Sequence, residues 1–129
     1  MARTAWLSVR GGRNEPNHTP AGVAGALAKL RAAALAERLV IDASHDNSGK
    51  DHTRQPAVAT AIGTQVAGGN AAIVGVMLES FLVEGRQDLD PTKPLVYGQS
   101  ITDACMSWER TEPLFTQLAQ AVRSRRAAP

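Results

Sequence analysis

Three short apolar segments recur at equal intervals along the chain, and this spacing limits the possible fold more than any other feature. They begin near Ala5, Leu39 and Ile73, so the second and third segments each start 34 residues after the one before. Apolar residues at helical spacing lie between them, which predicts the order strand, helix, strand, helix, strand. That alternation is typical of a (β/α) barrel or a doubly wound sheet. The sequence therefore predicts an α/β fold with three parallel strands.

Capping residues, prolines and glycines indicate where the helices should begin and end. Thr19 and Pro20 have the preferences of an N-cap and a first helical position, and Gly68-Gly69 is typical of a helix end. The first two strands are expected over residues 5–9 and 39–41. Helices are expected from Pro20 to about Ala36, from Pro56 to the Gly68-Gly69 pair, and from near Thr111 onward. Polar loops are expected over residues 46–53 and 84–94. Residues 100–108 are assigned neither to a helix nor to a loop.

The third apolar segment, residues 73–78, has no polar alternation. An uninterrupted apolar run of this length suits a strand buried on both faces, as in a parallel sheet. It is followed at once by Glu79, and α/β proteins build their sites at the carboxyl ends of such strands. The alternative is an edge strand followed by an acidic loop.

Three parallel strands cannot close a barrel, which typically needs eight. Residues 1–129 are therefore expected to be either an open α/β domain with exposed sheet edges or a partial barrel. The length of 129 residues corresponds to about one domain.

Composition limits the cellular compartment and the partners that we expect for the protein. Cys105 is the single cysteine, which excludes an internal disulfide and is typical of a reducing cytoplasm. No run approaches the roughly 20 apolar residues of a membrane span, so no membrane contact is expected. The net charge is +2, and the excess lies largely in Arg123, Arg125 and Arg126, which suit the last turn of a helix. No aromatic side chains interleave these arginines, so nucleic acid is not expected as a partner.

Each predicted strand ends close to a residue with useful chemistry. The first is followed by Arg10, the second by His45 and the third by Glu79, and a later loop adds Asp103. Because parallel strands end on one side of a sheet, the first three should lie close together. Histidine, glutamate and aspartate together are typical ligands of a divalent metal, with manganese, iron and zinc unresolved. An arginine beside them suits a phosphate or a carboxylate.

Plainer interpretations exist for each of these residues. His45 could cap a loop, Glu79 could be a solvated acid, and Asp103 could be a helix N-cap. The coincidence of three strand ends favours the site. The remaining candidates receive no site role: His18 and His52 lie in expected loops, Cys105 is expected as a small buried residue, and Trp108 as core packing.

Five ordered segments resemble the C-terminal part of class I 3-deoxy-D-arabino-heptulosonate 7-phosphate (DAHP) synthase, from about Trp6 to Arg126. They read LSVRGG at 7–12, IDASHDNS at 41–48, GVMLES at 75–80, VEGRQ at 83–87 and YGQSITDAC at 97–105. The resemblance implies about the last three βα units of a (β/α)8 barrel, or TIM barrel. It also implies the first step of the shikimate pathway of aromatic amino acid biosynthesis, a cytoplasmic condensation of phosphoenolpyruvate with erythrose 4-phosphate.

By the same resemblance, His45, Glu79 and Asp103 match metal ligands and Arg10 matches an arginine that holds phosphoenolpyruvate. The metal, whether manganese, iron, zinc or cobalt, would activate the aldehyde of erythrose 4-phosphate as a Lewis acid. His45 has an implied catalytic part as well, orienting water or substrate through its second ring nitrogen.

The resemblance also has departures. The family's fourth metal ligand, a cysteine, and its erythrose 4-phosphate motif belong to the first half of the barrel. Ala43 stands where phenylalanine is usual, and Arg86, in place of a usual asparagine, should bring a positive charge near the site. The chain alone is therefore expected to be incomplete and inactive, needing the other barrel half or self-association. The alternatives are a non-catalytic assembly or interaction module and an open metal-binding α/β domain with other chemistry.

Overall fold

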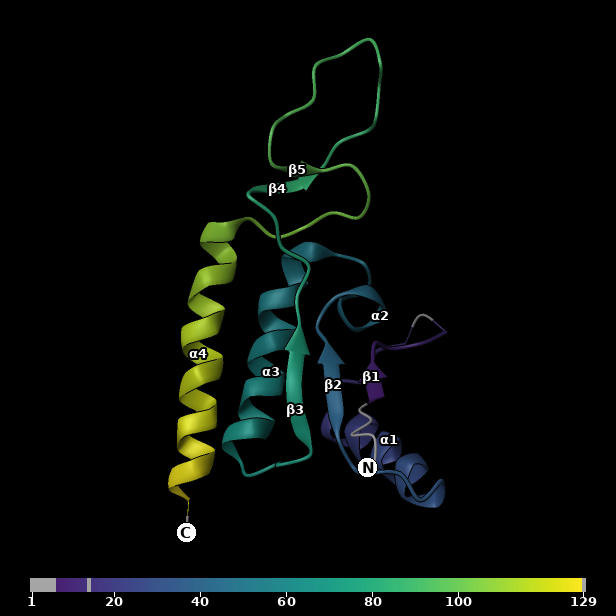
Figure 1. Ribbon diagram of the computed structural model, residues 1–129, viewed down its shortest axis with the longest axis vertical. Helices are drawn as coiled ribbons and strands as arrows, with labels where there is room; N and C mark the ends of the chain where they lie inside the picture. The colour runs from purple at the N-terminus through teal and green to yellow at the C-terminus, as the bar shows by residue number, and fades with distance from the viewer. Residues whose placement is uncertain (1–6, 14, 129) are drawn as a thin grey trace, which may run out of the picture.

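The computed structural model describes residues 7–13 and 15–128 and shows strands alternating with helices (Figure 1). In chain order the elements are β1 (Leu7–Val9), α1 (Pro20–Ala32), β2 (Leu39–Asp42), α2 (His45–Ser48), the 3-10 helix η1 (His52–Arg54), α3 (Gln55–Ala67), β3 (Ile73–Met77), β4 (Val83–Arg86), β5 (Gln99–Ser100) and α4 (Trp108–Ala127). None of the helices in these described ranges is both long and apolar enough to cross a membrane.

Strands β1, β2 and β3 form one parallel sheet, as the sequence predicts, and their order in it is β1-β2-β3. Leu7 pairs with Leu39, and Ile41 pairs with Val76. All three strands point the same way in Figure 1, so their carboxyl ends meet at the end of the sheet where β4 and β5 lie. This common end is where parallel α/β folds place functional side chains.

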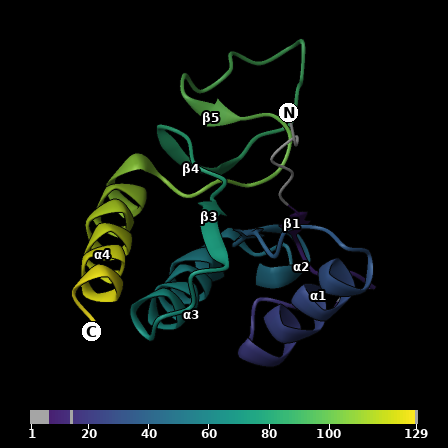
Figure 2. The ribbon, with the colours of Figure 1, turned by 60° about the horizontal axis from the view of Figure 1, so that its bottom comes forward.

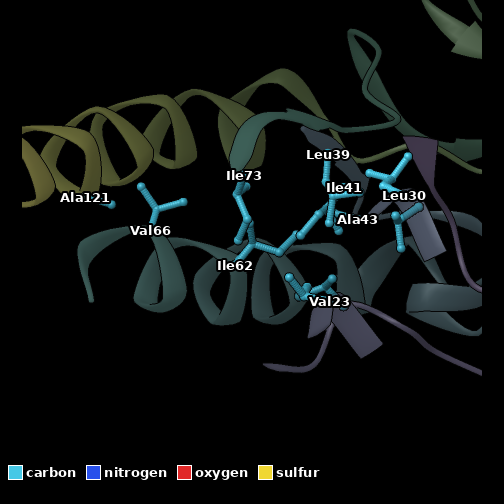
Figure 3. Packing of buried hydrophobic residues seen from close by; sticks show 11 residues of the cluster. Val23, Leu30, Leu39, Ile41, Ala43, Ile62, Val66, Ile73 and Ala121 are labelled. Carbon is cyan, nitrogen blue, oxygen red and sulfur yellow. The ribbon is translucent and has the colours of Figure 1, made fainter. Parts of the chain in front are cut away.

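The hydrophobic core lies between the sheet and the helices, which gather on one side of the strands (Figure 2). Leu39 and Ile41 of β2 and Ile62 of α3 are fully buried and pack with Val23 of α1 (Figure 3). Helix α4 lies beside α3 and adds Ala121 to the same cluster. Each large aliphatic side chain buried in this way contributes about 1.5–3 kcal/mol. The central strand β2 is therefore the most firmly held part of the sheet.

Strand β3 ends at Met77 and is not buried on both faces, contrary to the expectation for residues 73–78. Ile73 is buried, whereas Val74 is 51% exposed. The reason is that β3 pairs with β2 alone, and no other strand of the described residues lies along its second edge. Beside β3 and the start of α4 lies an apolar groove, lined mainly by Val76, Leu78, Phe81, Trp108 and Phe115.

Helix α1 begins where the sequence predicts and ends earlier. The hydroxyl of Thr19 caps it by accepting a hydrogen bond from the backbone nitrogen of Gly22 at 3.2 Å. The helix stops at Ala32 rather than near Ala36, because Ala34 adopts a left-handed backbone with φ of 54°. A left-handed residue just past the last turn is a common helix ending, although glycine is the usual residue there.

Helix α4 begins three residues before Thr111, at Trp108, with Ser107 as its N-cap. Trp108 is 47% exposed, so the expectation that it packs in the core is wrong. Its ring centroid lies 6.0 Å from that of Phe115, which is seven residues, or about two turns, further along α4. The last turn carries two of the expected basic residues, Arg125 and Arg126.

Two segments expected to be polar loops contain regular structure. Residues 46–53 include most of α2 and the start of η1, and residues 84–94 include most of β4. Val83 of β4 pairs in parallel with Gln99 of β5, across a connection of irregular chain. Short strands paired across such a distance leave no periodic pattern in the sequence.

Candidate metal centre

A cavity of about 620 Å³ opens at the carboxyl ends of the three parallel strands. Arg10, His45, Glu79 and Asp103, the four residues singled out from the sequence, all line it. Three follow β1, β2 and β3 directly, and Asp103 arrives from the segment between β5 and α4. The structure therefore brings all four candidates to one site.

Three of these side chains are close enough to share one metal ion. His45, Glu79 and Asp103 each offer a ligand atom, and the three atoms lie within 4.8 Å of one another. One imidazole nitrogen and two carboxylate oxygens suit a first-row divalent cation such as Mn²⁺, Fe²⁺ or Zn²⁺. The donor set and its spacing thus fit the metal that the sequence suggests.

His45 is held in a defined orientation. Its Nδ1 lies 2.7 Å from Oδ2 of Asp42, which is 2% exposed. A carboxylate oxygen accepts, so Nδ1 donates, and in the neutral imidazole Nε2 then has the free lone pair. Nε2 points toward Glu79, 3.5 Å from Oε1. The backbone of His45 is left-handed, with φ of 47°, and such unfavourable conformations of non-glycine residues cluster at functional sites.

Glu79 is fixed through both its backbone and its side chain. Its backbone nitrogen donates to Oε1 of Gln55 at 2.8 Å, and its carbonyl accepts from Nε2 of the same side chain at 3.2 Å. Gln55 is fully buried at the start of α3. The hydroxyl of Ser44 donates to Oε2 of Glu79 at 2.6 Å. The other carboxylate oxygen is thereby turned toward His45.

Arg10 reaches the cavity because β1 and β2 end side by side. The buried side chain of Asn47 in α2 donates to the carbonyls of Val9 and Asp42, at 3.2 and 2.7 Å. Gly11 then takes a left-handed turn, with φ of 80°, where an added Cβ would lie 2.5 Å from the Cβ of Asp46. Only glycine fits this close approach. Arg10 consequently leaves β1 directly beside the helix that carries His45.

Asp103 lies on the segment between Phe81 and Met106, called here the excursion. This segment leaves and rejoins the sheet and helices at neighbouring points. The backbone nitrogen of Phe81 donates to the carbonyl of Met106 at 2.9 Å. Further out, Gly85 and Cys105 exchange two backbone hydrogen bonds of 2.9 and 3.1 Å. Cys105 is only partly buried, where the sequence predicted a buried residue, and its partial burial raises the pKa of its thiol. Asp103 itself is exposed and precedes α4, so it is not the helix N-cap.

Positively charged side chains face the acidic ones across the cavity. Arg10, Lys50 and Arg86 line it, together with His52, which received no role from the sequence. His52 places Nε2 3.2 Å from a carboxylate oxygen of Glu84 in β4. Cations beside a metal-type donor group suit a ligand with phosphate or carboxylate groups.

Sequence reasoning missed the side chains that support the donors. Asp42, the last residue of β2, and Ser44, just beyond it, lie within three residues of His45, so their proximity was available as a signal. Gln55 carries no such signal, because it lies 24 positions from Glu79 and opens a helix. Its contact depends on how α3 packs against β3.

These features define a class of protein, a parallel α/β fold with a group of side chains at the strand ends that could hold a divalent metal. Comparison with known families specifies it further. A model described as the DAHP synthetase I family matches residues 4–116, and the chain belongs to this family.

Similar proteins agree with that assignment. A phospho-2-dehydro-3-deoxyheptonate aldolase of Corynebacterium glutamicum is 51% identical over 129 residues, covering 95% of this chain and 34% of that protein. The Phe-sensitive enzyme of that name from Escherichia coli K12 is 49% identical over 120 residues, covering 93% and 34%. The solved structure of the Francisella tularensis enzyme superposes with a TM-score of 0.88 at 44% identity, covering 93% of this chain and 35% of that chain. The chain thus spans about a third of the length of these relatives, and its fold is part of theirs.

Proposed function

We propose that this chain provides the metal-binding and phosphoenolpyruvate-binding part of a DAHP synthase, which condenses phosphoenolpyruvate with erythrose 4-phosphate. The observation that carries the proposal is the group of His45, Glu79 and Asp103, with ligand atoms within 4.8 Å, in one cavity with Arg10. The family assignment supplies the reaction, since the relatives are named as phospho-2-dehydro-3-deoxyheptonate aldolases.

Each residue has a distinct part in this proposal. His45, Glu79 and Asp103 hold a divalent metal, which when bound supplies Lewis-acid polarisation of an aldehyde oxygen. Arg10 binds the phosphate or carboxylate of phosphoenolpyruvate through its planar guanidinium. Asp42 keeps the Nε2 lone pair of His45 directed at the metal position. Nε2 could alternatively orient a water or substrate in the metal-free site.

The proposal includes association with further βα units of the family's barrel, in a partner polypeptide or a second copy. Two observations support it. The second edge of β3 has no strand partner among the described residues. Beside it, Val74 and Phe115 are 51% and 52% exposed. Apolar side chains along an open strand edge are a strong drive for association.

The test is an assay of phosphoenolpyruvate consumption with erythrose 4-phosphate and Mn²⁺. The chain is assayed alone and mixed with a polypeptide that supplies the first five βα units of a relative. We expect turnover in the mixture alone, because orientation of two phosphorylated substrates contributes about 7–11 kcal/mol to such a reaction. Arg10→Ala and Glu79→Ala should each abolish it. Turnover by the chain alone would contradict the proposed requirement for a partner.

A second candidate function is a non-catalytic assembly module. The exposed apolar groove beside β3 favours it, because that surface can bind a partner whether or not the cavity is used. A mixture that forms a complex and still consumes no phosphoenolpyruvate would favour this candidate over the enzyme.

A further inference from the structure

We propose that Arg86 is a positioning residue that holds Asp103 at the metal site. The inference rests on the proposed function, because it takes Asp103 as a ligand. Arg86 is the last residue of β4, and it lines the same cavity as Asp103. The sequence suggested only that Arg86 brings a charge to the site; the structure gives its guanidinium two specific partners.

The segment that carries Asp103 is held largely by side chains. Residues 101–104 belong to no helix or strand. The backbone nitrogen of Thr102 donates to the hydroxyl of Ser100 at 3.1 Å, and the carbonyl of Thr102 accepts from Nε of Arg86 at 2.9 Å. The Arg86 bond is therefore the contact that ties the residue directly before Asp103 to β4.

Arg86 is itself braced. Its Nη2 lies 2.6 Å from Oδ1 of Asp88, two residues along the chain. Immediately before it, Gly85 exchanges two backbone hydrogen bonds with Cys105, two residues after Asp103. Asp103 is consequently bracketed on both sides by contacts with adjacent residues of β4. Loss of a hydrogen-bonded partner of a metal ligand typically costs 10–100-fold in metal affinity, and a bond to the residue beside the ligand should act at or below the lower end of that range.

The positive charge of Arg86 allows a positioning effect on metal binding to be distinguished from a purely electrostatic one. A positive group beside a cation site repels the cation, so removing it should tighten metal binding. Loss of positioning should weaken binding. The two effects on Mn²⁺ affinity have opposite signs in Arg86→Met, which removes the charge and both hydrogen bonds.

The Arg86→Lys variant distinguishes the positioning effect from the electrostatic effect a second time. Arg86→Lys keeps the charge, yet one ammonium cannot reproduce the planar fork that reaches Thr102 and Asp88 together. Positioning therefore predicts that Arg86→Lys also weakens Mn²⁺ binding. Arg110→Met is the matched control, because Arg110 is an exposed arginine at the base of the same excursion, bonded to Glu84 rather than to Thr102.

The experiment is a Mn²⁺ titration of the whole chain followed by electron paramagnetic resonance of the free ion. We expect roughly tenfold weaker binding in Arg86→Met and at least about threefold in Arg86→Lys. Arg110→Met should bind as the parent does or slightly more tightly. In an Asp103→Asn background the effect of Arg86→Met should disappear. Unchanged or tighter binding in Arg86→Met would overturn the proposal.

A second readout needs no metal. Amide hydrogen exchange of Thr102 and Cys105 in the metal-free chain should be about tenfold faster in Arg86→Met and unchanged in Arg110→Met. If the parent chain binds no Mn²⁺, or if the His45→Ala variant binds Mn²⁺ as tightly as the parent does, the proposed function is wrong. Amide exchange then decides the part of Arg86 by itself, and equal exchange in parent and Arg86→Met would refute it.

Discussion

The buried side chain of Gln55 forms a two-bond pair with the backbone of Glu79, accepting from its nitrogen and donating to its carbonyl. Helix α3 and the chain just beyond β3 are joined at this point, at a residue that lines the cavity. The pair means that the position of a proposed metal ligand depends on the packing of a helix that carries no ligand itself.

Gln55→Met should lower both stability and metal affinity. Methionine fills a similar volume and leaves the backbone nitrogen of Glu79 without a partner, at a cost of about 1–3 kcal/mol. The carbonyl of Glu79 loses one of its two donors and keeps the bond from the backbone nitrogen of Met106. Urea unfolding measures the first effect and Mn²⁺ titration the second. Gln117→Met is the control, since exposed Gln117 bonds only to the hydroxyl of Thr60 and should change stability by less than about 0.5 kcal/mol. Parent-like Mn²⁺ affinity in Gln55→Met would separate Gln55 from the site.

Asp42→Asn should weaken metal binding while the fold persists. An amide oxygen accepts from Nδ1 of His45 less strongly than a carboxylate, and a rotated amide would favour the wrong tautomer of the ring. We expect roughly a 10–100-fold loss of Mn²⁺ affinity, with an unchanged circular dichroism spectrum. Asp46→Asn, one residue beyond His45, should have little effect. Equal losses in both variants would point to net charge instead of His45 orientation.

Association of the chain should depend on the open edge of β3. Val74→Lys places a charge on that edge, which natural sheets use to prevent pairing, so sedimentation velocity should show a shift toward monomer. Leu35→Lys is a closely matched control, because Leu35 and Val74 are both 51% exposed and Leu35 lies beyond the end of α1. A parent chain that sediments as a monomer at all concentrations would contradict the prediction.

Asp51 should contribute to the acid sensitivity of the chain. Hydrogen bonds from the hydroxyl and the backbone nitrogen of Thr53 lower the pKa of the Asp51 carboxyl. A depressed pKa in the folded state means that the stabilisation is present above the ordinary aspartate value, about 3.9, and is lost as pH falls through the lower folded value. Thermal unfolding between about pH 6 and pH 2 should therefore show a shallower acid decline in Asp51→Asn. A carboxyl NMR titration of Asp51 at the ordinary value would rule this out.

The sequence predicted which candidate residues lie together better than it predicted the elements around them. Arg10, His45 and Glu79 each follow a predicted strand, and parallel topology alone places such residues together. Asp103 was chosen as a carboxylate in a later loop, and topology did not place it with the other three, because no strand of the sheet ends beside it. Its place in the cavity arises from the pairing of β4 with β5, which the sequence does not mark.

The errors in the elements have local physical causes. The early end of α1 depends on a left-handed alanine, Ala34, for which composition gives no warning. The exposure of Val74 arises because no strand of the described residues covers the second edge of β3, and an apolar run cannot reveal whether such a neighbour is present. Gln55 was missed since a side chain that pairs with a distant backbone leaves no local pattern.

The narrow neck of the Asp103 excursion has an evolutionary consequence. The chain leaves at Phe81 and returns at Met106, and the two backbones are bonded at that point. Recombination between related genes at these two positions would exchange the excursion as one cassette, with Arg86 and Asp103 inherited together and the rest of the donor group undisturbed. Chimeras cut at this neck should therefore fold, and they offer a direct route by which the metal preference of the site could diversify in a single genetic event.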